Sequence, residues 1–433
     1  MYAGCAESRS LDAKENVISY LPVAAAQACI LEHVVSCVPE LVALHDALGR
    51  VLAEGVYANR NHPPYDVSAM DGYAVRFNDI SGATAAEPVL LRVIDDIRAG
   101  QMPGLRVLQG RSARIMTGAP VPAGADTVIR VEDTELDGDT VSILVAQRCG
   151  TNIRPLGENL RDGEVVLKAG TTITPGVLAI LAMVKKKEIS VFARPSVAIL
   201  STGDELEGLD EPVDDNKIPD ANSYALMAQC QALGITPVLL GIAHDNPIEI
   251  KAKLTEGLKY DVLLASGGVS VGHHDFMRPM LEELGIQMHF WRVAMRPGHP
   301  LAFGTSAKGT VVFGLPGNPV SSMVCFEQFA APALKRMMGY QKCYRRTVTA
   351  RLSHDLKDRE GRTHFVRVAL ERDATGYLAT STGTQGSGVL MSMALAEGLM
   401  IVPAAATSLA AGDEVIVQLL QDMDFQMEAA LER

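Results

Sequence analysis

Apolar residues recur in several patterns along the chain, and each pattern predicts a different kind of structure. From Pro22 to Glu54 they recur at spacings of three and four, which predicts a helix. From Val56 to about Ser142, short β-type runs such as VLLRVI and TVIRVED lie between Gly, Pro and Asp turns, which predicts a small β-rich insert. After Asn152 the chain runs through turns into a helix predicted over Pro175–Lys186, since proline suits the first helical turn.

The segment from about Pro195 to Met338 alternates apolar strands with amphipathic helices. Its candidate strands are SVAILST, PVLLGIA, DVLLASGG, HPLAFGT and TVVFGLPG, and its candidate helices start near Asn222, Pro247, Asp275 and Pro319. Continuous apolar strands with intervening helices predict a parallel sheet that is covered on both faces. Ligands bind such sheets at the carboxyl ends of the strands. From Gln341 onward, short strands alternate with turns and predict a compact β-barrel or sandwich.

Composition argues against several classes of protein. The chain has 433 residues, which predicts three or four structural units, and its net charge of -12 comes with no long basic run beyond Lys185–Lys187. A nucleic-acid-binding protein would present a basic face. The seven cysteines form no CxxC pair and no zinc spacing, and they fit a reduced cytoplasm. Because the sequence shows no signal peptide and no run of roughly 20 apolar residues, we expect a cytoplasmic protein without nucleic-acid or membrane partners.

An acidic loop follows the predicted strand SVAIL. It contains Gly203 and then two carboxylates, Asp204 and Glu205. The glycine would let the backbone approach a ligand closely, and carboxylates at a strand end can hold Mg²⁺ while a phosphate completes its coordination shell. A helix cap or turn that happens to be acidic explains the same residues, so both interpretations stay open.

Two glycine-bearing loops follow two further strands. SGGVSVGHHD runs from Ser266 to Asp275, and its glycines would expose amide N–H groups to an anion at a helix N-terminus. It is not a Walker loop, because no Gly-Lys-Ser/Thr follows, and a tight turn capped by Asp275 is the alternative. GLPGNPVSS runs from Gly314 to Ser322, with Pro319 suited to a helix start. Three special loops at strand ends of one sheet predict a single site there.

A cluster of basic residues without an acid lies in the run HFWRVAMRPGHP, from His289 to Pro300. If this run is extended, Arg292 and Arg296 face the same side. Arginines that line a sheet edge are one interpretation. In a chain with a net charge of -12, the cluster favours the binding of a phosphate or another oxyanion.

Further turn-rich motifs lie upstream, and together the motifs resemble a known family. The upstream motifs are PPYDVSAMDGYAV, IMTGAPVPAGADTVIRVED and NIRPLGEN, after the helical lead ALGRVLAE. With STGDEL, SGGVSVGHHD, RPGHP, GLPGNPVS and the late TGTQGS, they resemble the molybdopterin molybdenumtransferase family, which includes the C-terminal domain of gephyrin. The resemblance covers nearly the whole chain in order, and SAMDGYAV followed by SGGVSVG and GLPGNPVS is very specific in combination.

The resemblance implies a multidomain fold of the α/β plus β class. Its four parts are a helical linking domain (1–55 and 152–192), a β-rich insert (56–151), a doubly wound α/β molybdopterin-binding domain (193–340) and a C-terminal β-barrel (341–433). Such proteins are homodimers, and their active cleft lies between the α/β domain of one subunit and the β-rich domain of the other.

The resemblance also implies an activity. The enzyme takes adenylylated molybdopterin and molybdate, with Mg²⁺ as the divalent cation, and releases AMP and the molybdenum cofactor. The adenylyltransferase and the molybdoenzymes that accept the cofactor are further expected partners. The pterin dithiolene supplies the sulfur ligands of molybdenum, which agrees with the absence of a cysteine motif.

Residue by residue, the resemblance assigns roles to this chain. The catalytic candidates are Asp66, Glu205, Asp245, Asp275, Arg292 and Arg296, and the metal-ligand candidates are Glu205, Asp245 and Asp275. The substrate-binding candidates are Thr117, Arg154, Gly267, Gly268, Ser270, Gly272, His299, Pro316, Gly317, Asn318, Pro319 and Ser387. The arginines would hold pyrophosphate and molybdate by bidentate hydrogen bonds, and Mg²⁺ would polarise the pyrophosphate.

Two residues depart from the family pattern, which usually has Asp where this chain has Asn159 and Lys where it has His299. An amide cannot act as a general base, and a histidine is mostly neutral at pH 7. Asn159 keeps open a diverged, non-catalytic scaffold of the same fold. Adenylylation of molybdopterin is another alternative, but that enzyme typically carries Gly-Gly-Thr-Gly where this chain has Gly267-Gly268-Val269-Ser270.

Overall fold

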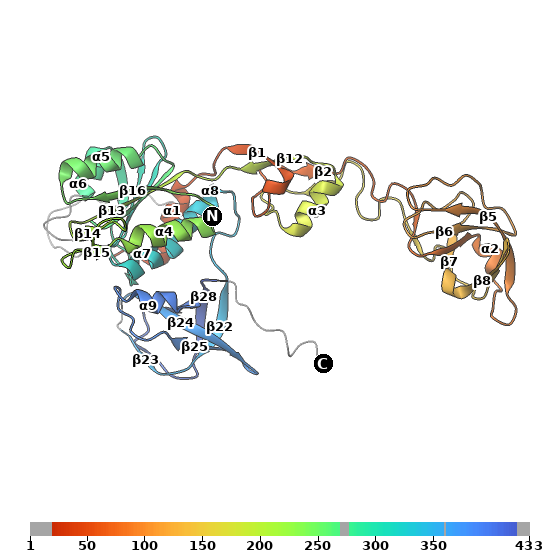
Figure 1. Ribbon diagram of the computed structural model, residues 1–433. Helices are drawn as coiled ribbons and strands as arrows, with labels where there is room; N and C mark the ends of the chain where they lie inside the picture. Colours follow the sequence, from red (N-terminus) through yellow and green to blue (C-terminus); the bar gives the residue numbers. More distant parts are fainter. Residues whose placement is uncertain (1–19, 269–276, 359–360, 422–433) are drawn as a thin grey trace, which may run out of the picture. The chain divides into compact units, whose positions relative to one another are not determined.

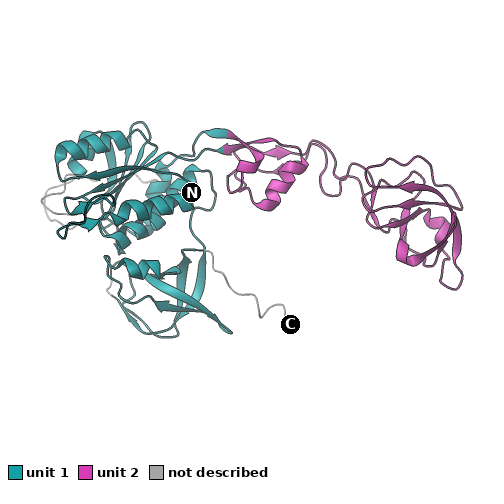
Figure 2. Cartoon of the chain, viewed as in Figure 1, with its two compact units in different colours: residues 1–40, 192–433 teal, residues 41–191 magenta. Residues whose placement is uncertain are grey.

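A computed structural model describes residues 20–268, 277–358 and 361–421, and the chain divides into two compact units (Figure 2). The first unit combines residues 1–40 with 192–433, and the second holds residues 41–191. The finer four-domain boundaries stay a prediction. Within the described ranges, every helix is too short or too polar to span a membrane.

A six-stranded sheet forms the centre of the first unit (Figure 1). In spatial order its strands are β16 (Val238–Ala243), β13 (Val197–Thr202), β17 (Val262–Ser266), β21 (Val311–Leu315), β20 (Ala302–Ser306) and β18 (Ile286–Phe290). The first four are parallel, as predicted, whereas β20 is antiparallel to both of its neighbours. The short connection 307–310 explains this difference, because a parallel crossover needs about a dozen residues or more.

Helices cover both faces of this sheet, because successive strand residues point to opposite sides. Val197 and Ile199 share one apolar core with residues of four helices, namely α1 (Val23–His33), α4 (Ala221–Ala232), α7 (Pro319–Cys325) and α8 (Ala331–Met337). Ala198 and Leu200 share the core on the other face with α5 (Pro247–Gly257) and α6 (Met277–Glu283). The predicted two-sided covering of the sheet is confirmed.

The predicted helix over Pro22–Glu54 is wrong beyond His33. Helix α1 ends there, and the chain continues as the strand β1 (Pro39–Ala43), which pairs with β12 (Glu188–Phe192). Pro39 explains the difference, because a proline restricts the preceding residue, here Val38, to extended conformations and cannot donate a helical hydrogen bond.

The C-terminal part of the first unit is a closed five-stranded barrel. Its strands are β24 (Thr363–Asp373), β25 (Gly376–Ser381), β22 (Thr347–Leu352), β28 (Glu414–Leu419) and β26 (Gly398–Val402), and β26 pairs back with β24. The strand β19 (Met295–Arg296), from the α/β part, also pairs with β24. Phe365 and Leu399 of the barrel lie in the same core as Phe326 of η3 (Phe326–Ala330), the π-helical turn between α7 and α8. The barrel and the α/β part therefore share one hydrophobic core.

The second unit contains the predicted β-rich insert. Its six strands, in spatial order, are β7 (Thr127–Arg130), β4 (Gly72–Val75), β6 (Arg111–Ile115), β5 (Val89–Ile97), β9 (Thr140–Ile143) and β8 (Thr134–Asp137). The strand β3 (Val67–Ser68) pairs with β10 (Ile153–Arg154), so the segments before and after the six-stranded sheet lie side by side. The helix α3 (Pro175–Met183) begins at its proline, as predicted, with Thr174 as its cap.

Candidate functional site

The three special loops lie at one edge of the sheet of the first unit. They follow β13, β17 and β21, which are adjacent and parallel, so their carboxyl ends lie together. The N–H of Gly267 donates to the carbonyl oxygen of Leu315 at 3.0 Å, and the Ser266 hydroxyl donates to that of Pro316 at 3.3 Å. The SGGVSVG and GLPGNPVS loops therefore meet, as predicted. The candidates Ser270, Gly272 and Asp275 lie outside the described residues.

A buried polar network, which the sequence analysis did not predict, holds these loops together. The amide of Asn222, on α4, donates to Ser266 Oγ and to the Gly317 carbonyl oxygen, both at 2.7 Å. Asp220 accepts from the Ser201 hydroxyl at 2.9 Å and from the Ser223 N–H at 3.1 Å, and so joins the β13 end to the helix start. The sequence Asp-Ala-Asn-Ser is a typical helix cap, and that was the available signal.

Gly267 is the position where the loops come closest to the backbone of β13. Its φ is +94°, and a Cβ there would lie 2.4 Å from the carbonyl oxygen of Thr202. A side chain would therefore meet both backbone strain and a steric clash. Only glycine fits without a shift of the neighbouring strand end.

The metal-ligand candidates Glu205 and Asp245 are exposed at the ends of the adjacent strands β13 and β16. The Asp245 N–H donates to Asp204 Oδ1 at 3.0 Å, which ties the two loops together. The Glu205 carboxylate folds back against Gly203, where a Cβ would lie 2.4 Å from Glu205 Oε2. Among the described residues, no group of three His, Cys, Asp or Glu side chains is arranged to hold a metal by itself.

The basic run is not one extended strand, so the expectation that Arg292 and Arg296 face the same side of a strand does not apply. The strand β18 ends at Phe290, and β19 covers only Met295–Arg296. The barrel strand β24 comes alongside β19 and brings Arg362 to this segment. Burial, and then the charges of Arg362 and Arg292, lower the pKa of His299. Two arginines from distant parts of the sequence thus act on one imidazole.

Arg296 is held by an ion pair with the buried carboxylate of Asp358. His364 Nδ1 lies 2.8 Å from both Arg296 Nη2 and Asp358 Oδ2. Burial lowers the pKa of His364, although the charge of Asp358 acts in the opposite direction. Much of the Arg296 charge is therefore already offset by the protein.

Arg367 is a fully buried arginine on β24 beside the TGTQGS loop. It donates to the Gly386 carbonyl oxygen at 3.1 Å and to Ser392 Oγ at 3.2 Å, while its Nη1 has no partner within the described part of the chain. Burial, and then the charge of Arg296, lower its pKa to about 10. The carbonyl oxygen of Ser387, in this loop, accepts from the Val320 N–H at 3.2 Å and so reaches the GLPGNPVS segment.

Three candidates of the second unit meet around β3. Thr117 donates its N–H and its hydroxyl to Asp71 Oδ1, both at 2.7 Å, and these bonds hold the pKa of Asp71 below its usual value. Arg154 lies opposite Val67 in the β3–β10 pair, and its Nε is 2.8 Å from Glu158 Oε2. Asp66, just before β3, accepts the Leu156 N–H at 2.7 Å.

Comparison with known proteins assigns the chain to a family. It matches the MoeA N-terminal region (domain I and II) over residues 21–184, a probable molybdopterin binding domain over 198–336 and the MoeA C-terminal region (domain IV) over 349–420. It is 36% identical over 383 residues to the molybdopterin molybdenumtransferase of Nostoc sp., which covers 87% of this chain and 88% of that protein. The chain belongs to the molybdopterin molybdenumtransferase family.

Other members of the molybdopterin molybdenumtransferase family agree with this. The protein of that name from Bacillus subtilis is 35% identical over 388 residues, which covers 88% of this chain and 90% of the relative. A crystal structure of a molybdopterin biosynthesis moeA protein from Pyrococcus horikoshii OT3 matches 93% of this chain and 100% of its own, with a TM-score of 0.81 and 30% identity.

Proposed function

We propose that this protein inserts molybdenum from molybdate into adenylylated molybdopterin and releases AMP and the molybdenum cofactor. The observation that best supports this is the convergence of three special loops at one sheet edge, in a chain that matches a molybdenumtransferase over 87% of its length. The phosphates of the substrate would lie along this edge, against Gly267, Gly268 and the segment Pro316–Pro319.

Molybdate, the second substrate, would bind at the basic segment beside the barrel. Arg292 and Arg362 both act on His299 there, and guanidinium groups bind oxyanions through paired hydrogen bonds. Because partial burial strengthens electrostatic attraction, a tetrahedral dianion would gain more here than on an open surface. Arg296 and Ser387 would complete the binding surface from the two sides of this segment.

The carboxylates of the sheet edge fit a divalent cation. Mg²⁺ usually keeps several waters and binds through one or two carboxylates together with substrate phosphates. Glu205 and Asp245 offer such hard oxygen donors at adjacent strand ends, and Asp275 is the third candidate. When bound, Mg²⁺ would polarise the pyrophosphate toward hydrolysis. Glu205 and Asp245 would orient the Mg²⁺ ion relative to the arginines.

We further propose a homodimer in the cytoplasm, with Asp66, Thr117 and Arg154 contributing to catalysis. The cysteines at positions 29, 37, 149, 230, 325 and 343, within the described ranges, are all free thiols, which fits a reducing compartment. The mass of the protein in solution tests the dimer directly. A monomer at micromolar concentration would contradict it.

Mg²⁺-dependent release of AMP from adenylylated molybdopterin and molybdate tests the function. Glu205→Ala and Asp275→Ala should each abolish turnover while the protein stays folded, because each removes a hard oxygen ligand. Glu256→Ala, an exposed glutamate on α5, is the matched control and should keep its activity. Turnover that is unchanged in both site variants would rule out the metal role. A folded wild-type protein without turnover would favour the scaffold alternative.

A further inference from the structure

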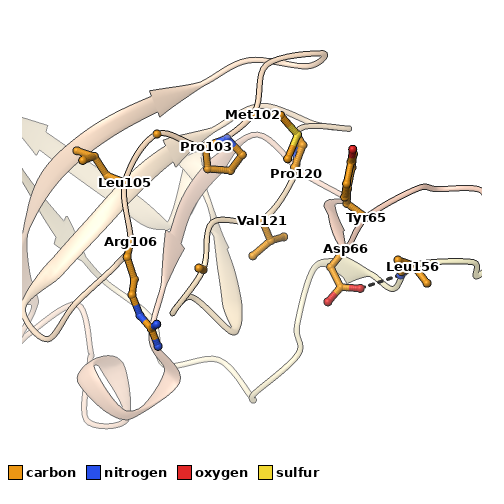
Figure 3. Close-up of a pocket in the computed structure, with 11 residues that line it drawn as sticks. Tyr65, Asp66, Met102, Pro103, Leu105, Arg106, Pro120, Val121 and Leu156 are labelled. Atoms are coloured by element: carbon orange, nitrogen blue, oxygen red, sulfur yellow. Dashed lines mark hydrogen bonds between the residues drawn. The ribbon is translucent and has the colours of Figure 1, made fainter.

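A cavity of about 720 Å³ beside Asp66, in the second unit, has charged side chains that do not converge. The Leu156 N–H donates to one oxygen of the Asp66 carboxylate at 2.7 Å, and the Arg106 guanidinium lies across the cavity, directed away from that carboxylate (Figure 3). Polar ligands are bound by groups that converge on one place. Charged and aromatic side chains do converge in the first unit, at the basic run 289–300.

Three stretches of backbone that are far apart in the sequence lie side by side at this run. Ala294, in the middle stretch, donates its N–H to the Leu21 carbonyl oxygen at 2.8 Å, and its own carbonyl oxygen accepts the Thr363 N–H at 3.0 Å. The Leu21 N–H in turn donates to the Arg292 carbonyl oxygen at 3.1 Å. Backbone hydrogen bonds therefore hold the residues just before Leu21 and Thr363 close to the basic run.

Those two residues are Tyr20 and Arg362, and their side chains meet. The guanidinium carbon of Arg362 lies over the Tyr20 ring, 4.9 Å from the ring centre. This distance is within the roughly 6 Å at which an aromatic face attracts a cation. The centre of the same ring is 6.1 Å from that of the His299 ring. A tyrosine thus lies among the groups to which the proposed function assigns molybdate.

The contact with Tyr20 restrains Arg362 without using its hydrogen-bond donors. Arg296 shows the opposite case, because its guanidinium is paired with the Asp358 carboxylate. Within the part of the chain that the structure describes, Arg362 has no carboxylate partner and no side-chain hydrogen bond. The ring face attracts the positive charge but leaves the in-plane N–H groups available to an oxyanion. An arginine held in this way also loses less conformational freedom when the anion binds.

We propose that Tyr20 is a positioning residue for molybdate binding, and that it acts by holding Arg362 against the face of its ring. This inference rests on the proposed function, which makes molybdate a substrate at the basic run. A direct hydrogen bond from the Tyr20 hydroxyl to the oxyanion is the alternative role, and it would depend on the hydroxyl rather than on the ring. The two roles therefore predict different effects of Tyr20→Phe.

Calorimetric titration of molybdate into the full chain, without pterin or metal, tests the inference. Tyr20→Phe keeps the ring face and should keep the wild-type Kd. Tyr20→Leu keeps an apolar side chain but removes the ring, and it should raise Kd by about 2- to 5-fold, as expected for a partly exposed contact between a cation and a ring. Tyr377→Leu is the matched control. It removes a similar contact with Arg372, at 6.0 Å, near the other end of β24, and its Kd should equal that of the wild type.

A double-mutant cycle shows whether Tyr20 acts through Arg362. Arg362→Met should weaken molybdate binding more than Tyr20→Leu does, because it removes the donors themselves. Adding Tyr20→Leu to Arg362→Met should then leave Kd unchanged. In turnover assays, Tyr20→Leu should raise the KM for molybdate and keep the wild-type kcat, whereas a loss of folded protein would lower the apparent kcat.

Three results would overturn the inference: wild-type affinity in Tyr20→Leu, equally weak binding by Tyr20→Phe and Tyr20→Leu, or a further loss when Tyr20→Leu is added to Arg362→Met. The second would assign the role to the hydroxyl, and the third would mean that Tyr20 does not act through Arg362. Wild type that binds no molybdate would overturn both proposals. Because the titration needs no turnover, the predicted affinities in a protein that inserts no molybdenum would contradict only the proposed function. Active enzyme whose molybdate affinity ignores Tyr20→Leu would contradict only this inference.

Discussion

The side-chain amide of Asn222 donates a hydrogen bond of 2.7 Å to the carbonyl oxygen of Gly317. The same amide nitrogen bonds Ser266 Oγ, so one side chain at the start of α4 joins the ends of β17 and β21. Asn222 thus bonds the Ser266 side chain before one loop and the Gly317 backbone of the other, and both loops carry candidate site residues. We therefore treat it as a positioning residue.

Asn222→Ala should reduce both the stability and the activity of the protein. Loss of its buried hydrogen bonds leaves polar groups unsatisfied, which costs about 1–3 kcal/mol of the free energy of unfolding. Urea denaturation and molybdenum insertion assays measure the two effects. Gln231→Ala, an exposed residue of the same helix, should change neither. If Asn222→Ala lowered stability but kept full activity, its role would be structural only.

Gly267→Ala should be far more damaging than Gly317→Ala, although the two glycines are neighbours. A Cβ at 267 meets the Thr202 carbonyl oxygen at 2.4 Å and a φ of +94°, whereas a Cβ at 317 has its nearest neighbour at 3.8 Å. We expect Gly267→Ala to lower the free energy of unfolding by about 1–3 kcal/mol or more, and Gly317→Ala to change it little. Thermal denaturation of both variants is the measurement. Equal melting temperatures would contradict the geometry.

Arg296→Met should destabilise the protein by leaving the buried Asp358 carboxylate without its arginine. Breaking a fully buried pair costs about 3–5 kcal/mol, and the partial exposure of Arg296 predicts a value of about 1–3 kcal/mol. In a double-mutant cycle, Asp358→Asn should recover part of this loss. Arg296→Met should also raise the molybdate concentration needed for turnover. Additive losses in the double variant would mean that the pair is not coupled.

His299→Lys should lower the molybdate concentration needed for turnover at pH 7.5. The pKa of His299 lies below its usual 6.5, so the side chain is neutral at that pH, whereas lysine brings a charge. As the pH falls through the lowered pKa of His299, the wild-type imidazole gains its proton, and the difference between the two proteins should shrink. Protonation in the folded state is disfavoured, so stability should also fall as pH drops below 6.5. Molybdate titrations at pH 7.5 and at a series of lower pH values decide this, and a pH-independent difference would contradict it.

Asn159→Asp should raise the rate of molybdenum insertion. The substitution is nearly isosteric and restores a carboxylate, and general acid–base assistance is commonly worth about 10²-fold or more. The Asn159 N–H bonds the His62 carbonyl oxygen at 3.0 Å, a contact that aspartate keeps. Rates at several molybdate concentrations give the answer. A rate equal to or below that of the wild type would mean that Glu158 or Asp162 has taken over the role. The new charge would then have no effect or would be repulsive.

Local patterns predicted those parts of the fold in which local forces decide the structure. The parallel strands and their helices followed from apolar runs of the right length, and α3 and α7 begin at the prolines expected to start them. The predicted first helix was too long, because an apolar spacing of three and four also suits a short helix followed by turns and a strand. In that segment the helix has already ended at His33, and Pro39 prevents any helix from running on through Val38.

The site was only partly predictable because its residues meet through distant pairings. Loop glycines and carboxylates carry local signals, and these candidates lie at the sheet edge. No local sequence signal marks Arg362, His364 or Arg367. These residues lie within or beside a barrel strand, and the place of that strand next to Met295–Arg296 depends on a contact between distant segments. Asp358 likewise gives no hint in the sequence that it will neutralise Arg296.

The core that joins the barrel to the α/β part limits how this protein can be divided. Phe365, Met393 and Leu399 pack with Phe326 and Phe329, so a chain cut before the barrel would expose aromatic surface beneath the GLPGNPVS helix. Such a fragment would tend to aggregate rather than work as a smaller enzyme. The barrel and the α/β part should therefore melt in one calorimetric transition, unlike domains that are joined only by flexible linkers.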